Sequence, residues 1–221
     1  LRVDAGSPGD LEVRHHGGGR LVPDWREISD SPEGKDPPIP WKEGGVYLIT
    51  GGAGGLGLIF AEEIAGRVTD AAVILAGRSS LGDAARDRIG SLESSSARVA
   101  YRQADVARMD EVTNLLDGIL KEFGSLDGII HAAGVIRDSF ILKKTVDEIR
   151  EVLAPKVAGL ANLDEASKDM PLDLFVIFSS DSSMGAVGQA DYACANAFMD
   201  RYAEHRQEMA DAGRRHGRTL S

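Results

Sequence analysis

Beyond residue 45 the chain alternates short apolar runs with segments whose apolar residues recur every three or four positions. Val46–Thr50 is the clearest run, and 110–123 is the clearest periodic segment. Continuous runs rich in β-branched residues predict buried strands, whereas the longer spacing predicts amphipathic helices. The pattern predicts strands at 46–50, 72–76, 98–103, 126–131 and 172–178, and helices at 56–66, 82–92, 110–123, 146–167 and 192–212.

This alternation predicts the fold class. Strands that are apolar throughout are typical of a parallel sheet covered by helices on both faces. We therefore expect an α/β, doubly wound, Rossmann-like domain. In such a sheet ligands bind at the carboxyl ends of the strands.

The first 45 residues have a different character, because they hold six of the eight prolines and the run Gly17–Gly19. Short strands are predicted at 11–15 and 21–25, and a linker is predicted at 30–40. We therefore divide the chain into a preceding piece at 1–43 and a core domain at 44–221.

Composition narrows the function classes. With 221 residues, 43% of them hydrophobic, the chain can bury the core of one medium domain. A net charge of -10 argues against binding nucleic acid or an anionic membrane. The lone Cys194 excludes an internal disulfide or a cysteine-rich metal site, and we predict no metal. With no signal peptide or apolar span in view we expect a cytoplasmic protein, and the missing initiator Met suggests a fragment of a longer one.

A glycine-rich turn follows the first core strand. Glycines permit a tight turn close to a pyrophosphate, and the N-terminus of the next helix offers free N–H groups. A turn that only packs helix on strand is the alternative. The predicted cofactor-binding residues are Thr50, Gly51, Gly52, Ala53, Gly54, Gly55, Leu56 and Gly57.

The end of the second strand predicts which cofactor binds. Arg78 stands where an NAD site usually has an acidic residue, and an arginine there favours the 2′-phosphate of NADP. We expect Arg78 to bind that phosphate with help from Ser79. A solvated surface arginine is the alternative.

Two further strand ends complete the predicted cofactor site. Asp105 and Val106 follow the third strand, and Asp105 could accept a hydrogen bond from the adenine amino group. Ala132, Ala133 and Gly134 follow the fourth strand and leave room for the ribose. A capping role for Asp105 and tight packing for the alanines are the alternatives, and His131 is expected to be a packed strand residue.

Hydroxyl groups gather at the end of the fifth strand and on the helix after it. Ser179 and Ser180 end the strand, and Tyr192 and Asn196 share one face of the helix. Hydride addition to a ketone builds negative charge on oxygen, which needs a hydrogen-bond donor and a proton donor. A tyrosine acting as that proton donor needs a nearby cation. Capping, packing and surface roles are the alternatives for each residue taken singly.

Over residues 44–221 the chain resembles the ketoreductase domains of modular polyketide synthases, within the short-chain dehydrogenases. In that family the catalytic Lys lies in the helix before the Ser strand and an Asn follows the Tyr, as Lys156 and Asn196 do here. The Ser180–Tyr192 spacing of 12 is one residue shorter than is usual, so Ser179 stays open as the alternative. The matching segments are Thr50–Gly57, Leu75–Ser79, His131–Val135, Lys156–Gly159, Phe175–Ser180 and Gly188–Ala193.

The resemblance implies an activity and its partners. NADPH would reduce the 3-keto group of an acyl chain carried on the phosphopantetheine arm of an acyl carrier protein. Tyr192 would donate the proton, Ser180 would bind the carbonyl oxygen, Lys156 would lower the Tyr192 pKa, and Asn196 would orient Lys156 or a relay water. A catalytically silent NADP-binding scaffold and a free-standing short-chain alcohol dehydrogenase are the rivals.

The resemblance also bears on domain limits and stereochemistry. Residues 1–43 resemble the tail of the family's structural subdomain plus a linker, and neighbouring synthase domains are expected partners. The C-terminal strands and lid of the family are expected to be truncated. The spelling Gly188–Tyr192 leans toward the trans-acyltransferase branch. Asp138 matches one Asp of a signature that orients substrate, which favours a D-configured hydroxyl, and a loop cap is the alternative role for Asp138.

Overall fold

The computed structural model describes residues 10, 13–22, 24, 39–92 and 97–221, and the chain divides into two units, 1–38 and 39–221. The smaller unit contains an antiparallel hairpin of β1 (Arg14–His16) and β2 (Gly19–Leu21). Gly17 and Gly18 have φ angles of +58° and +79° and form its two-residue turn. The second strand thus starts earlier than the predicted 21–25, and residues 11, 23 and 25 lie outside the described residues.

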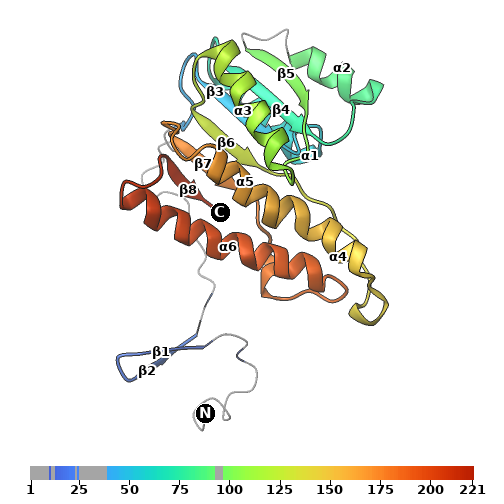
Figure 1. Ribbon diagram of the computed structural model, residues 1–221, viewed down its shortest axis with the longest axis vertical. Helices are drawn as coiled ribbons and strands as arrows, with labels where there is room; N and C mark the ends of the chain where they lie inside the picture. The colour runs from blue at the N-terminus through green and yellow to red at the C-terminus, as the bar shows by residue number, and fades with distance from the viewer. Residues whose placement is uncertain (1–9, 11–12, 23, 25–38, 93–96) are drawn as a thin grey trace. The chain divides into compact units, whose positions relative to one another are not determined.

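A six-stranded parallel sheet forms the centre of the larger unit (Figure 1). The strand order is β5-β4-β3-β6-β7-β8, which is the doubly wound order predicted from the sequence. The order reverses between β3 and β6, so the ligand crevice of such a fold opens at the carboxyl ends of these two strands. The strands are β3 (Val46–Thr50), β4 (Ala72–Gly77), β5 (Arg98–Gln103), β6 (Gly128–His131), β7 (Leu174–Ile177) and β8 (Arg218–Leu220).

Helices cover both faces of this sheet. On one face, Leu58 and Ile64 of α1 and Ile89 of α2 pack against β3 and β4. On the other, α3, α5 and α6 pack against the alternate residues of the same strands. The helices are α1 (Gly55–Arg67), α2 (Asp83–Leu92), α3 (Met109–Phe123), α4 (Val146–Leu153), α5 (Gly159–Ala166) and α6 (Ala190–Asp211), with short helical turns η2 (Ile141–Lys143) and η4 (Asp181–Met184).

The helix predicted at 146–167 contains an irregular turn. Between α4 and α5 the chain forms a π-helical turn, η3 (Ala154–Ala158), in which the Gly159 N–H donates to the Ala154 carbonyl. Pro155 has no N–H, which removes one bond of a regular α-helix and favours a wider turn. Lys156 lies within this turn.

The sixth strand is formed by the last residues of the chain. β8 lies parallel to β7, with Leu220 opposite Val176. The predicted division at residue 43 stays a prediction, although Trp41 already packs edge-on against Tyr47, with ring centroids 5.4 Å apart. Among the described residues no helix is both long and apolar enough to cross a membrane.

Candidate functional site

The glycine-rich turn between β3 and α1 is closely packed against the rest of the sheet. Gly51 has a φ of +68°, and a Cβ there would lie 2.6 Å from the Ala132 carbonyl oxygen. A Cβ on Gly52 would lie 2.7 Å from the Leu75 Cβ, and one on Gly57 would lie 2.5 Å from the Gly52 Cα. These three positions therefore leave no room for a side chain. The glycines do pack the helix against the sheet, as the alternative interpretation of this turn holds.

The N-terminus of α1 also suits an anion. Gly54 is its N-cap and supplies no side-chain hydrogen bond, and the first turn holds no acidic residue. The first backbone N–H groups thus lack side-chain partners and carry the positive end of the helix dipole. Gly54, Gly55 and Leu56 are exposed beside them. A bare glycine surface in front of free N–H groups fits the pyrophosphate of a dinucleotide.

A pocket of about 120 Å³ lies along the strand ends next to this turn. It takes residues from the carboxyl ends of β3, β4, β5 and β6, the crevice where the fold predicts a ligand. Six of the residues predicted to bind the cofactor line it: Gly51, Arg78, Asp105, Val106, Ala133 and Gly134.

Arg78 and Ser79 are held by their backbone. The Arg78 carbonyl accepts from Gln103 Nε2 at 2.9 Å, and the Ser79 carbonyl accepts from the Tyr101 hydroxyl at 2.5 Å. Both residues are exposed, and neither side chain makes a hydrogen bond or ion pair with another described residue. The Arg78 guanidinium is therefore available to an anion.

Asp105 has a structural role in this crevice. Its Oδ1 accepts from the Ala107 N–H at 3.0 Å, while its own N–H donates to Glu111 Oε2. Asp105 thus caps a turn, as the alternative interpretation holds. The capped turn precedes α3, whose own N-cap is Arg108. Contact between Asp105 and adenine stays a prediction.

The predicted catalytic residues come together from three elements. Lys156 Nζ of η3 donates to Asn196 Oδ1 of α6 at 2.8 Å and to the carbonyl of Phe178, just after β7, at 2.9 Å. The same Nζ lies 5.0 Å from the centre of the Tyr192 ring. Asn196 Nδ2 donates to Ser182 Oγ at 3.1 Å. The structure thus brings Lys156 together with Tyr192 and Asn196.

Burial shifts two titratable groups in this cluster. Desolvation lowers the pKa of Lys156 from 10.5 to about 8. Burial and the charge of Lys156 lower the pKa of His131 from 6.5 to about 4. His131 is therefore neutral at pH 7: its Nε2 donates to the Pro155 carbonyl and its Nδ1 accepts from Thr50 Oγ1. As predicted, His131 is a packed strand residue, and it ties β3 to η3.

The two serines lie between β7 and η4 and make different contacts. Ser179 Oγ donates to the Asn196 carbonyl at 3.3 Å. Ser180 Oγ accepts from the Ser182 N–H at 3.2 Å and donates to Asp181 Oδ1 at 3.1 Å. Ser180 therefore has the capping role weighed for it, and its binding of a carbonyl oxygen stays a prediction beside the Ser179 alternative.

Asp138 lies in the loop after β6. Both of its carboxylate oxygens accept from Gln189 Nε2 at 3.1 Å. The loop role weighed for Asp138 is thus present, and its orienting role stays a prediction. No roles were predicted from the sequence for Gln189, Ser182 or the pair of Lys144 with Asp191. The available signal was that Gln189 and Asp191 lie within three residues before Tyr192.

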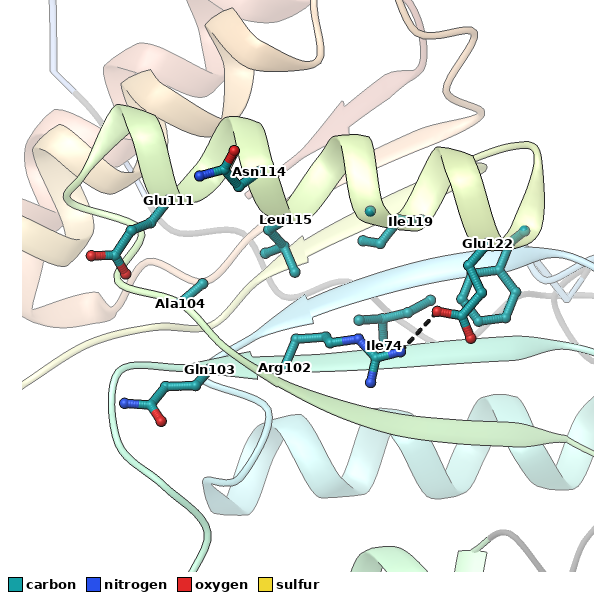
Figure 2. Close-up of a pocket in the computed structure, with 11 residues that line it drawn as sticks. Ile74, Arg102, Gln103, Ala104, Glu111, Asn114, Leu115, Ile119 and Glu122 are labelled. Atoms are coloured by element: carbon teal, nitrogen blue, oxygen red, sulfur yellow. Dashed lines mark hydrogen bonds and ion pairs between the residues drawn. The ribbon is translucent and has the colours of Figure 1, made fainter.

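A larger pocket, of about 340 Å³, lies between β5 and α3 (Figure 2). An ion pair from Arg102 Nη2 to Glu122 Oε2, 2.8 Å long, crosses its side. None of the predicted catalytic residues lines it. In the part of the chain that the structure describes, no group of three His, Cys, Asp or Glu side chains could hold a metal ion. The predicted catalytic residues therefore lie outside this pocket.

Comparison with known proteins finds relatives among the polyketide synthases. Polyketide synthases PksN and PksL of Bacillus subtilis (strain 168) are 52% and 51% identical to the chain over 96% and 97% of its length. The matched part is only 4% and 5% of those two proteins.

Solved structures agree with the fold. A ketoreductase domain from the bacillaene assembly line has a TM-score of 0.90 and 47% identity, over 98% of this chain and 51% of that one. A structure described as A-type ketoreductases from a modular polyketide synthase has a TM-score of 0.81 and 30% identity, over 94% and 43%. The family model described as KR domain matches residues 45–214, so the chain belongs to the KR domain family of polyketide synthases, with the Rossmann-like fold of short-chain dehydrogenases.

Proposed function

We propose that this domain uses NADPH to reduce the 3-keto group of a polyketide thioester to a hydroxyl. One observation carries the proposal: buried Lys156 hydrogen-bonds Asn196 and lies under the Tyr192 ring, beside a glycine turn that fits a dinucleotide. The bound nicotinamide would supply the hydride. The rest of the chemistry falls to the side chains of the domain.

Tyr192 is the proton donor in this proposal. The ketone oxygen gains charge as hydride arrives, and the Tyr192 O–H bond breaks as the new O–H bond of the alcohol forms. Ser180 donates a hydrogen bond to the same oxygen. The Lys156 ammonium, 5.0 Å from the ring centre, stabilises the tyrosinate that remains.

Asn196 acts on Lys156 and not on the ketone. It is fully buried, and its Oδ1 holds Nζ while its amide is held by Ser182. With the Phe178 carbonyl it fixes the direction of the ammonium. The proposal thus gives Asn196 the first of its two predicted roles, orienting Lys156.

Cofactor and partners follow the same proposal. Arg78, exposed at the end of β4, would bind the 2′-phosphate with Ser79. The substrate would arrive on the phosphopantetheine of an acyl carrier protein, and neighbouring synthase domains would surround the unit formed by residues 44–221. The synthase relatives support these partners, since the chain matches only 4% and 5% of their length.

The test is turnover by the intact synthase protein that contains this domain. We expect NADPH absorbance to fall when a 3-ketoacyl thioester is added, and no fall in a Lys156→Met variant. NADPH binding without turnover in the wild type would contradict the proposal and favour a silent scaffold. Turnover of simple ketones alone, with none of the thioester, would favour an alcohol dehydrogenase.

We further propose that the product hydroxyl is D-configured, which is (3R) for a simple acyl chain. Asp138 carries this prediction, and the side from which the acyl chain enters decides which ketone face meets the hydride. Chiral chromatography of the alcohol made from an unbranched 3-ketoacyl thioester should show the D form as the main product. A predominantly L product would leave Asp138 with its Gln189 contact only.

A further inference from the structure

Two chain segments beside the candidate site are joined by polar contacts. The loop after β6 runs to Lys144, and residues 188–191 lead into Tyr192. The Asp138–Gln189 contact joins them at one point, and the Ser139 N–H donates to the Gly188 carbonyl at 2.9 Å. At a third point Lys144 Nζ lies 2.7 Å from Asp191 Oδ2. These three contacts, here called the clasp, hold the loop against the start of α6.

The ion pair is the buried part of the clasp. The Lys144 and Asp191 side chains are only 1% and 2% exposed. Lys144 Nζ also donates to the Arg137 carbonyl, which folds the loop back on itself. Asp191 Oδ1 accepts from the Tyr192 N–H at 3.0 Å. The pair therefore connects the loop to the backbone of the proposed proton donor.

Both ends of the pair are anchored. Thr145 follows Lys144 and begins α4 with a capping box, in which the Glu148 N–H donates to Thr145 Oγ1 and Glu148 accepts from the Thr145 N–H. Asp191 lies in the first turn of α6, where its charge suits the helix dipole. The two side chains thus connect two helix starts through the loop.

Stability alone is a weak reason for such a pair. Burying two charges costs desolvation energy, and an apolar pair of similar volume is often at least as stable. A buried ion pair does fix the relative orientation of the two segments that carry it, because each buried charge must stay next to its partner. Asp191 directly precedes Tyr192, so the orientation of these segments affects the position of the proposed proton donor.

The joined segments also present apolar side chains to solvent. Phe140 and Leu142 on the loop side are 63% and 96% exposed, and Val187, just before the second segment, is 88% exposed. An acyl chain that entered here would contact both segments. A shift of the loop would then change how the ketone meets Tyr192.

We propose that the Lys144–Asp191 pair is a positioning device that holds the loop of residues 136–144 against the start of α6 and so sets how the ketone is presented to Tyr192. This inference rests on the proposed ketone reduction. Both are positioning residues, since they act through the loop and through Tyr192. The pair sets substrate orientation and leaves the cofactor site unchanged.

The experiment compares Lys144→Met, Asp191→Asn and the double variant in the intact synthase protein. The double variant leaves no unpaired buried charge, so it tests the idea even where a single variant fails to fold. We expect kcat/KM for a 3-ketoacyl thioester to fall by about 10²-fold, the scale of a small misplacement of reacting groups. The product should become a mixture of D and L alcohols, while the NADPH dissociation constant stays within about twofold of wild type. The two single losses should not add, because they break one contact.

Lys143→Met is the matched control, since Lys143 is exposed one residue away. It should leave rate and product configuration unchanged. A variant that melts earlier yet keeps wild-type KM and product configuration would overturn the inference and make the pair merely structural.

Hydrogen exchange separates this inference from the proposed function. Amides of residues 136–144 should exchange faster in the double variant than in wild type, with or without turnover. Unchanged exchange would overturn the positioning role whatever the activity. A wild-type protein that does not reduce the ketone would overturn the proposed function instead.

Discussion

The Tyr192 hydroxyl has no hydrogen-bond partner among the described residues, although its ring lies 5.0 Å from the Lys156 ammonium. Asn196 Nδ2 donates to Ser182 Oγ. Lys156 Nζ has three acceptors, namely Asn196 Oδ1, the Phe178 carbonyl and Met199 Sδ. A hydroxyl left free in an otherwise satisfied cluster is suited to donate its proton to a bound ketone.

Tyr192→Phe removes that single oxygen and keeps the ring against Lys156. We expect kcat to fall by about 10²–10⁴-fold, the usual contribution of a proton donor. NADPH affinity, measured by fluorescence titration, should stay at the wild-type value. Wild-type turnover by the Phe variant would exclude Tyr192 as the donor.

Arg78 is the residue on which cofactor choice depends. Arg78→Ala should weaken NADPH binding by about 10-fold or more while leaving NADH binding nearly unchanged, because a charge-assisted hydrogen bond to the 2′-phosphate is worth about 1.5–3 kcal/mol. Arg86→Ala is the control, since Arg86 is exposed on α2 and pairs with Asp83. Dissociation constants for both cofactors measure the effect. Full NADPH preference in the Arg78 variant would assign the phosphate to another group.

At the scale of the element, close packing shapes the start of α1. Gly57 faces Gly52 so closely that a Cβ would meet backbone, whereas a Cβ on Gly66 of the same helix would meet nothing within 4 Å. A side chain at position 57 would therefore force the backbone to move, whereas one at position 66 would not. The two glycines form a matched pair for mutation.

Gly57→Ala should displace α1 from the turn, lower the free energy of unfolding by about 1–3 kcal/mol, and weaken NADPH binding by about tenfold or more. Gly66→Ala should raise the free energy of unfolding by up to about 1 kcal/mol, since alanine suits a helix interior better. Denaturant unfolding and cofactor titration measure both. Equal effects of the two variants would refute the packing argument.

The hydrophobic pattern predicted most elements well, because strands covered on both faces are apolar throughout and each helix has one apolar face. The 46–50 and 98–103 strands agree with the structure at both ends. The π-helical turn at Pro155 was missed, since a proline signals a break without specifying its shape. Helix α6 starts at Ala190, two residues before the predicted Tyr192, because the apolar spacing does not mark where the first turn begins.

The site residues, like the helices and strands, were predicted where a local pattern marks them and missed where distant segments meet. Residues at strand ends were predicted from the fold, and Tyr192 and Asn196 were placed together by helix spacing. Lys156 was predicted only from the resemblance to the family. The Lys144–Asp191 contact spans 47 positions between a loop and a helix start, and no periodicity reports such a pair. The contacts of Ser179 and Ser180 depend on the turn η4, whose geometry spacing does not reveal.

For the whole molecule, one buried charge network ties the last strand to the helices. Asp164 of α5 accepts from Arg206 Nε of α6 at 2.8 Å and from the Tyr202 hydroxyl at 2.9 Å. Arg206 Nη1 continues to Thr219 Oγ1 in β8 at 2.8 Å. Burial lowers the pKa of Arg206, and the Asp164 charge opposes that shift. Two helices and the edge strand are thus held as one body.

His131 makes the stability of this body depend on pH. Its pKa is about 4 in the folded chain and 6.5 without burial, so the unfolded chain binds more protons between these values. Stability is therefore complete above pH 6.5 and falls as the pH drops toward 4. The loss from this group reaches up to about 3 kcal/mol, since one pKa unit is worth about 1.4 kcal/mol. Lys156 adds no slope there, because it stays charged in both states below its pKa of about 8.

His131→Gln should remove this slope, because a neutral amide can accept from Thr50 and donate to the Pro155 carbonyl at every pH. Urea unfolding at pH 7.5, 6.0 and about 4.5 measures the free energy of both proteins, and carboxylates that titrate in the same window contribute equally to each. Wild type should lose more stability than the variant across this range. His205→Gln, at an exposed position of α6, should keep the wild-type slope. Parallel curves for wild type and His131→Gln would mean that His131 has the same pKa in the folded and the unfolded chain. A protonated His131 would still donate from Nε2 to the Pro155 carbonyl, and its Nδ1 would donate to Thr50 Oγ1 instead of accepting from it.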